Sequence, residues 1–244
     1  MKHWITKNGM KIYRIVFGRS NVFLLSNGIR NILIDTGVKR CLGRVSSGIN
    51  AIGQNSCDYI VLTHSHHDHA ANAASISKQY NAKIILHKSE TELLEKGISK
   101  LPKGTIPVTK FLVDNFENKV SSKFAFDPKK CDIAVDRYYD LNELGFRAYI
   151  MHTPGHTKGS ISIIVDGEIA IVGDAMFGIF KGSIFPPYAD DVSGMVKSWG
   201  RLVDTGCKLF LPAHGSANTR ELVTNQYNKY KKRLNDSYPG VEIE

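Results

Sequence analysis

Four side chains of types that commonly bind metal ions lie within six positions of one another in the sequence: His64, His66, Asp68 and His69. Imidazole and carboxylate groups together are typical ligands of zinc, iron and similar cations. On an extended loop, His64 and His66 point to the same side. Asp68 and His69 lie where the chain turns into a helix, so one short loop could serve two metal ions. This run predicts a metal-dependent activity.

Three further residues of the same types occur downstream, each after a predicted strand: His156, Asp174 and His214. Functional loops gather at one end of a sheet, so residues at strand ends are well placed to complete a site. Two hairpins also resemble each other. An aspartate follows the turn glycine by seven positions in both, as Asp35 after Gly28 and Asp174 after Gly167. Either an internal duplication or a chance likeness of two hairpins explains this match.

The remaining pattern favours strands that alternate with helices. Short strands are predicted at 20–26, 29–34, 59–62, 83–86 and 208–211, and helices at 70–80 and 89–96. Apolar residues at helical spacing in 192–203 predict a core-facing helix. The last helix is expected to begin at Asn218, with Glu221 as its capping partner. Residues 97–130 lack periodicity and are expected to form an irregular insertion that covers the site or faces a partner.

Composition is that of one globular domain, 1–244, with 42% hydrophobic and 23% charged residues. The formal charge of +9 could indicate nucleic acid, but the basic residues are spread along the chain. An anionic small-molecule substrate fits equally well. The N-terminus lacks an apolar leader, no stretch reaches membrane-spanning length, and the four cysteines have no C-x-x-C spacing. A cytoplasmic protein without a membrane partner is expected, and self-association through the insertion stays open.

Taken together, four motifs resemble the metallo-β-lactamase superfamily. They are His64-x-His66-x-Asp68-His69, Thr153-Pro154-Gly155-His156, Gly173-Asp174 and Pro212-Ala213-His214-Gly215. The resemblance runs from about Asp35 to His214. It implies an α/β fold, a four-layer αββα sandwich of two mixed β-sheets flanked by helices, with the site at one sheet edge. It would also explain the matching hairpins as two related halves.

Carried over to this chain, the resemblance implies two divalent metal ions, with zinc expected and iron or manganese as alternatives. The first would be held by His64, His66 and His156, the second by Asp68, His69 and His214, and Asp174 would bridge them. Asp35 would orient a metal-binding histidine or loop. His67 fills a variable position of the motif, whereas His152 and His87 are expected to be structural.

The expected chemistry is hydrolysis. Two dications bring four positive charges, whereas the carboxylates of Asp68 and Asp174 bring two negative charges. Metal binding also lowers the pKa of water to about 7. A metal-bridging hydroxide would attack the substrate, and Asp68 is the predicted catalytic residue that orients it or relays a proton. Asp174 stands where antibiotic-hydrolysing branches carry cysteine or serine. The pattern is more similar to hydroxyacylglutathione hydrolases and lactonases, so an ester, thioester or lactone is the expected substrate.

The loop after Asp174 should line the pocket. Phe177, with Phe180 and Phe185, could form an apolar wall, while Lys181 or Tyr188 could meet a carboxylate or carbonyl. The alternative is that these aromatics anchor the loop. The cysteine- and arginine-bearing signature expected here in glutathione thioesterases is absent.

Two other functions remain alternatives. A phosphodiesterase or nuclease of the same fold suits two metals and a basic chain, but no additional phosphate-binding element is evident. An iron-dependent oxidoreductase would be either mononuclear or a diiron protein working with flavin. The complete second set of ligands disfavours the former, and no flavin-binding domain is evident.

Overall fold

Two β-sheets lie face to face in the computed structural model, which describes residues 1–53, 55–121 and 124–237. One sheet has seven strands in the order β1-β2-β3-β4-β5-β6-β7 and the other six in the order β13-β12-β11-β10-β9-β8. The strands are β1 (Lys2–Ile5), β2 (Lys11–Val16), β3 (Val22–Ser26), β4 (Asn31–Ile34), β5 (Tyr59–Val61), β6 (Lys83–His87), β7 (Ile133–Val135), β8 (Tyr138–Asp140), β9 (Ala148–His152), β10 (Ile161–Val165), β11 (Ile169–Gly173), β12 (Leu209–Pro212) and β13 (Asn218–Thr219). Both sheets mix parallel and antiparallel pairs.

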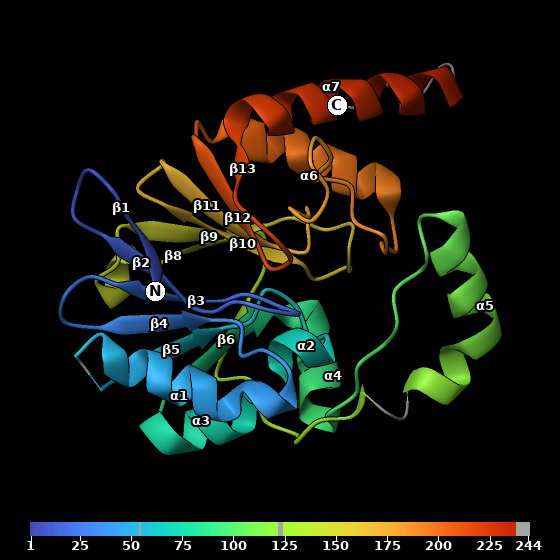
Figure 1. Cartoon of the computed structure of the whole chain (residues 1–244). Helices are drawn as coiled ribbons and strands as arrows, with labels where there is room; N and C mark the ends of the chain where they lie inside the picture. The colour runs from blue at the N-terminus through green and yellow to red at the C-terminus, as the bar shows by residue number, and fades with distance from the viewer. Residues whose placement is uncertain (54, 122–123, 238–244) are drawn as a thin grey trace.

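Helices cover the two outer faces (Figure 1). The described residues form the helices α1 (Leu42–Ala51), α2 (His67–Ala70), α3 (Ala73–Tyr80), α4 (Thr91–Lys96), α5 (Pro107–Ser121), α6 (Val192–Asp204) and α7 (Arg220–Ser237), with 3-10 turns at Lys39–Cys41, Lys88–Glu90 and Asn142–Leu144. The helices α1 and α3 pack on the first sheet, and α6 and α7 on the second. Within the described ranges, none of the helices combines the length and the apolar character that crossing a membrane requires. The expected αββα sandwich is confirmed.

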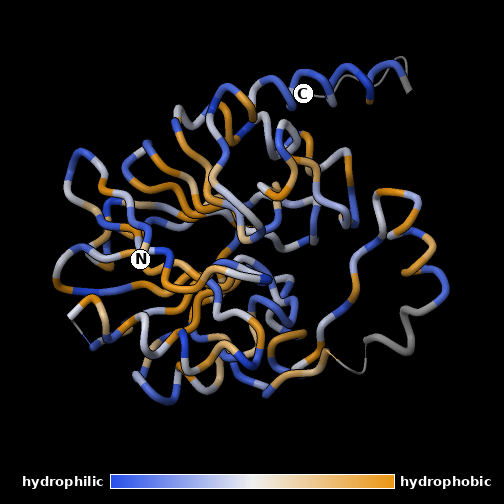
Figure 2. Tube along the Cα trace, viewed as in Figure 1, coloured by the Kyte–Doolittle hydropathy of each residue, from blue (hydrophilic) through white to orange (hydrophobic). Residues whose placement is uncertain are grey.

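Alternation of side chains along the central strands supplies two apolar layers at once. In β3, Phe23 and Leu25 point into the core between the sheets, whereas Leu24 packs under the helices of the first sheet. In β10, Ile163 faces the same central core and Ile164 faces the helices of the second sheet. Because both faces are covered, these strands are wholly buried and read as continuous apolar runs, which Figure 2 shows in orange.

The two matching hairpins occupy equivalent places in their sheets. The β3–β4 pair is antiparallel and is followed by a parallel β4–β5 pair. The β10–β11 pair is likewise antiparallel and is followed by a parallel β11–β12 pair. This shared topology favours two related halves over a chance likeness of two turns.

The sheets are hydrogen-bonded to each other at one end. The carbonyl oxygen of Thr63, just after β5, accepts from the backbone N–H of Ile161 at the start of β10, at 2.9 Å. The backbone N–H of Asn21, before β3, donates to the carbonyl of Ala213 after β12, at 2.6 Å. The predicted ligands of both halves follow or adjoin these points, so the join brings them to one edge of the sandwich.

The helix expected at 70–80 is interrupted. It divides into α2, which begins earlier at His67, and α3, which begins at Ala73. Between them, the side-chain amide of Asn72 donates to the carbonyls of Thr36 at 2.8 Å and Val38 at 2.9 Å. Asn72 takes φ −108° and ψ 7°, outside helical values, and the amide binds the loop after β4. The prediction of one continuous helix was therefore wrong.

The start of the last helix was also predicted wrongly. Asn218 belongs to β13, where it pairs with Phe210, and α7 begins at Arg220. The hydroxyl of Thr219 accepts from the backbone N–H of Leu222 at 3.3 Å, so Thr219 acts as the N-cap. Glu221 has the capping-box spacing from Asn218 and not from Thr219, but pairing of Asn218 with Phe210 in β13 moves the start of the helix one position later.

The insertion at 97–130 is not irregular throughout, because it contains α5. That helix stands apart from the sandwich in Figure 1, and its Val108 and Phe111 are exposed. A helix that does not pack one face on a core needs no apolar stripe, so its sequence lacks the periodicity by which helices are predicted. The segment before α5 is bonded to the loop before α6: the N–H of Thr105 donates to Pro187 at 3.0 Å, and the carbonyl of Lys103 accepts from Ala189 at 2.9 Å.

His87 and His152 form a stacked pair outside the metal-ligand cluster. Their rings lie 4.2 Å apart with planes 14° from parallel, at the ends of β6 and β9. Burial, together with the neighbouring His152, lowers the pKa of His87 to about 4. In the unfolded chain a histidine titrates near 6.5. His87 therefore stays neutral in the folded protein at pH values where the unfolded chain takes up a proton.

This difference predicts a loss of stability in mild acid. As the pH falls from about 6.5 towards 4, the free energy of unfolding of the wild type should fall because the unfolded state binds one more proton at this position. His87→Asn keeps an acceptor for the N–H of Ser89 and removes that proton uptake. The amount by which His87→Asn is less stable than wild type, in free energy of unfolding, should therefore shrink as the pH falls across this interval. Urea denaturation in the presence of a chelator measures it.

The control is His3→Asn, which replaces an exposed histidine. A constant difference between wild type and His87→Asn from pH 7 to 4 would contradict the assignment.

Candidate metal centre

Three histidine rings meet at the edge where the sheets join. The loop between β5 and α2 carries His64 and His66 and brings His64 Nε2 to 2.9 Å from His66 Nδ1. His156 Nε2 lies 3.1 Å from the same Nδ1. All three are buried. Gly155 precedes His156 at φ 138°, and a Cβ there would come within 2.3 Å of the backbone of Met195, so glycine is needed for the loop to pack under α6.

A second group of donors lies beside the first. Asp68 and His69, in the first turn of α2, face His214 from the loop after β12. The Nε2 atom of His69 is 3.8 Å from Asp68 Oδ1, and that of His214 is 3.5 Å from Asp68 Oδ2. Ligand atoms of this group lie within 4.8 Å of one another, as do those of the three-histidine group.

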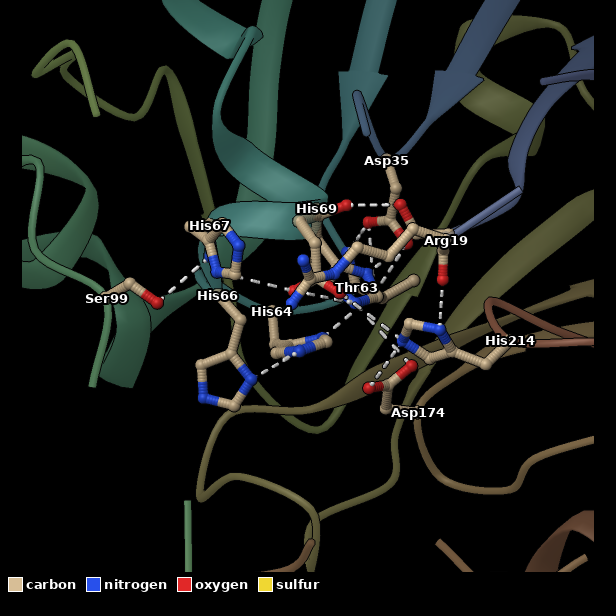
Figure 3. A network of polar contacts seen from close by, with 12 residues as sticks. Arg19, Asp35, Thr63, His64, His66, His67, His69, Ser99, Asp174 and His214 are labelled. Atoms are coloured by element: carbon tan, nitrogen blue, oxygen red, sulfur yellow. Dashed lines mark hydrogen bonds and ion pairs between the residues drawn. The ribbon is translucent and has the colours of Figure 1, made fainter. Parts of the chain in front are cut away.

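Asp174 stands between the two groups (Figure 3). Its Oδ2 is 3.4 Å from His156 Nε2 and 3.3 Å from His214 Nε2, and its Oδ1 is 3.6 Å from His69 Nε2. It follows Gly173, where φ is 51° and a Cβ would meet the side chain of Thr63 at 2.7 Å. The end of β11 can approach the motif loop this closely because position 173 is glycine.

The ring nitrogens turned away from the centre are held by partners from other elements. Asp35 Oδ2 lies 2.8 Å from His69 Nδ1, and its Oδ1 accepts from the N–H of Thr63 at 2.8 Å. The carbonyl of Tyr188 lies 2.9 Å from His156 Nδ1, and that of Arg19 lies 2.5 Å from His214 Nδ1. Such outer contacts set ring orientation and leave Nε2 directed inward.

Glu90 is a buried residue that sequence reasoning missed. Its carboxylate accepts from the N–H of Ser65 at 3.2 Å and from that of Gly159 at 3.1 Å. One side chain thereby ties the loop that carries His64 and His66 to the loop that carries His156. The only sequence signal was a glutamate in an otherwise ordinary helix start.

The donors fit a metal centre. Within the described ranges, His69 Nε2 and Asp174 Oδ1 are buried atoms without a hydrogen-bond partner. Leaving such atoms unpaired costs about 1–3 kcal/mol each, whereas a divalent cation would satisfy both. Imidazole and carboxylate donors in two adjoining groups suit two cations of the zinc or iron type.

Ionisation in the cluster follows burial and charge. Burial lowers the pKa values of His64 and His66 well below the usual value, so both are neutral and able to bind a cation. Burial also disfavours the charged form of His69, but the carboxylates of Asp174 and Asp35 outweigh it and raise its pKa well above the usual value. His69 must therefore release a proton when it binds a metal ion.

A cavity of about 690 Å³ opens onto these ligands. Of the residues predicted to contact substrate, Phe177 and Tyr188 line it. Lys181 is exposed and is not among the lining residues. The predicted wall is only partly correct, because Phe180 is 65% exposed and Phe185 stacks on Tyr230 in the core of the second half. The insertion supplies much of the remaining wall.

His67 also lines the cavity, although the motif leaves its position open. Its ring stacks on Phe124 at 4.0 Å, and its backbone N–H donates to Ser99 Oγ at 3.0 Å. The insertion thus contacts the motif at a position outside the ligand set.

Comparisons with known proteins agree with this fold. The family model of the metallo-beta-lactamase superfamily matches residues 15–214. A metallo-beta-lactamase fold-containing protein of Sulfurisphaera tokodaii is 26% identical over 203 residues, covering 80% of this chain and 72% of the relative. A probable metallo-hydrolase of Methanocaldococcus jannaschii is 30% identical over 177 residues, 71% of this chain and 76% of the relative.

Solved structures share the architecture. An archaeal metallo-beta-lactamase superfamily protein from Sulfolobus tokodaii superposes with a TM-score of 0.63 at 22% identity, covering 96% of this chain and 89% of the other. A metallo-beta-lactamase of Cronobacter sakazakii gives 0.65 at 18% identity, covering 98% and 96%. With a family model that spans most of the chain and every donor of the seven-residue set gathered at one sheet edge, this protein belongs to the metallo-β-lactamase superfamily.

Proposed function

We propose that this protein is a hydrolase that binds two divalent metal ions, expected to be zinc, and cleaves an ester, thioester or lactone in a small molecule. The observation that carries the proposal is the position of Asp174, whose carboxylate faces His156 of one donor group and His69 and His214 of the other. A carboxylate shared in this way suits two ions better than one. The superfamily consists mostly of metal-dependent hydrolases.

The chain's own residues divide the work. One ion would be held by His64, His66 and His156 and the other by Asp68, His69 and His214, with Asp174 facing both. When bound, the two cations would acidify a water molecule and polarise the scissile group. Asp68 lines the cavity, and we assign its carboxylate the holding and passing of a proton during cleavage.

The cavity favours small organic substrates over nucleic acid. Its lining beyond the ligands is mainly apolar, and its cationic members other than histidine are Arg19 and Lys100. A phosphodiester chain would need a longer positive groove. The probable metallo-hydrolase of Methanocaldococcus jannaschii, among the relatives, is in keeping with hydrolysis.

Removing the shared carboxylate should lower metal content and activity together. We expect Asp174→Ala to bind fewer than two metal ions per chain by mass spectrometry, and to lose activity on thioesters, lactones or aryl esters by about 100-fold or more. Asp204→Ala, which removes an exposed carboxylate from the end of α6, is the matched control. A variant with two ions and near-normal turnover would refute the shared position of Asp174.

Asp35 should act on metal affinity through His69. Asp35→Asn keeps the side-chain shape and tolerates the positive φ of 60° at this position, but removes the negative charge beside the ring. We expect metal affinity to fall by about 10- to 100-fold, measured by competition with a chromogenic chelator. Asp58→Asn is the control, since Asp58 accepts the N–H of Asn31 in the same sheet. Equal affinities in the two variants would show that Asp35 does not tune the centre.

The reaction class is tested by a screen of metal-loaded protein on thioesters, lactones, aryl esters and phosphodiesters. Turnover of a carbonyl substrate is expected. Cleavage of phosphodiesters alone would overturn this choice of substrate, and one iron per chain with oxygen consumption would overturn the hydrolytic function.

A further inference from the structure

We propose that Arg19 binds an oxyanion of the substrate, so that the preferred substrates carry a carboxylate or phosphate group in addition to an apolar acyl group and the bond that is cleaved. This inference rests on the proposed hydrolase function. It assigns specificity to a residue of the β2–β3 loop, which no motif of the family pattern marks in this sequence.

Arg19 lies at the mouth of the metal-facing cavity. It is exposed, and it lines the cavity together with Asp68, Asp174 and His214. Figure 3 shows its side chain among the ligand residues. A group bound by the guanidinium would therefore sit within one small molecule's length of the metal ligands.

The backbone around Arg19 is fixed to the metal centre. Its carbonyl lies 2.5 Å from His214 Nδ1, and the hydroxyl of Ser20 donates to the carbonyl of Asp68 at 2.6 Å. The side-chain amide of Asn21 donates to the carbonyl of Pro212 at 2.9 Å. Because its Cα is held in register with both ligand loops, Arg19 loses mainly side-chain freedom when it binds a ligand.

The charge of Arg19 is available to a ligand. Across the described ranges, its guanidinium forms neither a hydrogen bond nor an ion pair. The carboxylates that line the cavity are Asp68 and Asp174, and both face histidines. A planar guanidinium donates two parallel N–H bonds to a carboxylate or phosphate, a geometry that a lysine does not offer.

Other cations near the site fit this role less well. Lys100 also lines the cavity, but its ammonium group does not offer the planar pair of parallel N–H donors that a guanidinium offers to a carboxylate or phosphate. Lys181, the residue expected from the sequence to meet a carboxylate, lies outside the cavity lining. Among the cations of the cavity lining, Arg19 is the one that combines a guanidinium group with backbone contacts to the loops of His214 and Asp68.

The remaining wall explains why an apolar group should accompany the anion. Six apolar side chains line the same cavity: Leu101, Pro102, Leu112, Phe124, Phe177 and Ile179. A volume of about 690 Å³ is within the range of small-molecule sites. Burying an acyl chain against this wall would contribute binding free energy that does not depend on charge, while Arg19 selects the charged member of a pair of substrates.

The test compares two pairs of substrates in the metal-loaded protein, and each pair has one anionic and one neutral member of similar size. In the first pair, mono-4-nitrophenyl glutarate carries a carboxylate on the acyl side and 4-nitrophenyl butyrate is neutral. In the second pair, S-(4-carboxyphenyl) thiobutyrate carries the carboxylate on the leaving group and S-phenyl thiobutyrate is neutral. Each is assayed with the wild type, Arg19→Gln and Lys181→Gln, which remove one positive charge inside and outside the cavity respectively.

In at least one pair, the ratio of kcat/KM for the anionic over the neutral substrate should fall about tenfold or more in Arg19→Gln, mainly through KM. In Lys181→Gln the ratio should stay at the wild-type value. The wild-type ratio should also decrease with added salt, since Arg19 is exposed. Ratios that change equally in both variants for both pairs would overturn the assignment of Arg19 while leaving the hydrolase function in place.

If none of the four substrates is cleaved, that result counts against the proposed hydrolase function and not against Arg19. A binding measurement then tests the assignment of Arg19 by itself. Isothermal titration calorimetry with glutarate and butyrate compares a dianion with a monoanion that cannot engage both the metals and Arg19. Preference for glutarate should be lost in Arg19→Gln and kept in Lys181→Gln. Its persistence in Arg19→Gln would exclude Arg19 as the anion-binding residue.

Discussion

The site depends on the way Thr63 joins the two halves of the molecule. Its carbonyl accepts from Ile161 of the second sheet, and its N–H and hydroxyl both donate to Asp35 of the first. Gly173 packs directly against its side chain, immediately before Asp174. Four strand ends therefore converge on one residue. Without this convergence, donors far apart in the sequence would not lie within a few ångströms of one another.

Gathering so many polar groups in the interior has a free-energy cost that only their partners offset. Burial disfavours the charged forms of Asp174 and His69, and each is held ionised by the other and by neighbours of opposite charge. Glu90 stabilises the surrounding loops by accepting backbone N–H groups from two of them. Within the cluster, His69 Nε2 and Asp174 Oδ1 are buried and have no hydrogen-bond partner among the described residues, which is consistent with a centre that is completed by cations.

Sequence patterns predicted the sandwich and the grouping of donors because both follow from strong local signals. Continuous apolar runs such as β3 and β10 mark strands buried on two faces, and the spacing of His64, His66 and Asp68 marks a ligand loop. The errors arose where tertiary contacts override local preference. Asn72 breaks a helix by binding a distant loop, and Asn218 is drawn into a strand.

The cavity wall was the least predictable part, for a related reason. Lys181 and Phe185 follow a ligand strand in sequence, yet Phe185 turns into the core against Trp199 and Tyr230. Arg19 precedes β3 without any motif of its own, and its position depends on contacts with His214 and Asp68 that appear only in three dimensions. Proximity along the chain was a poor guide to which side chains face the substrate.

The insertion meets the motif loop at His67, which supplies no ligand atom to the predicted centre, and it is also hydrogen-bonded to the loop at 186–190. Most of the apolar wall of the cavity and the predicted metal donors are thus carried by separate parts of the chain. Changes in Leu101, Pro102 or Leu112 would reshape the cavity while leaving the donors in place. Descendants of such a protein can therefore change the shape of the cavity by altering this segment, while the set of donors is inherited intact.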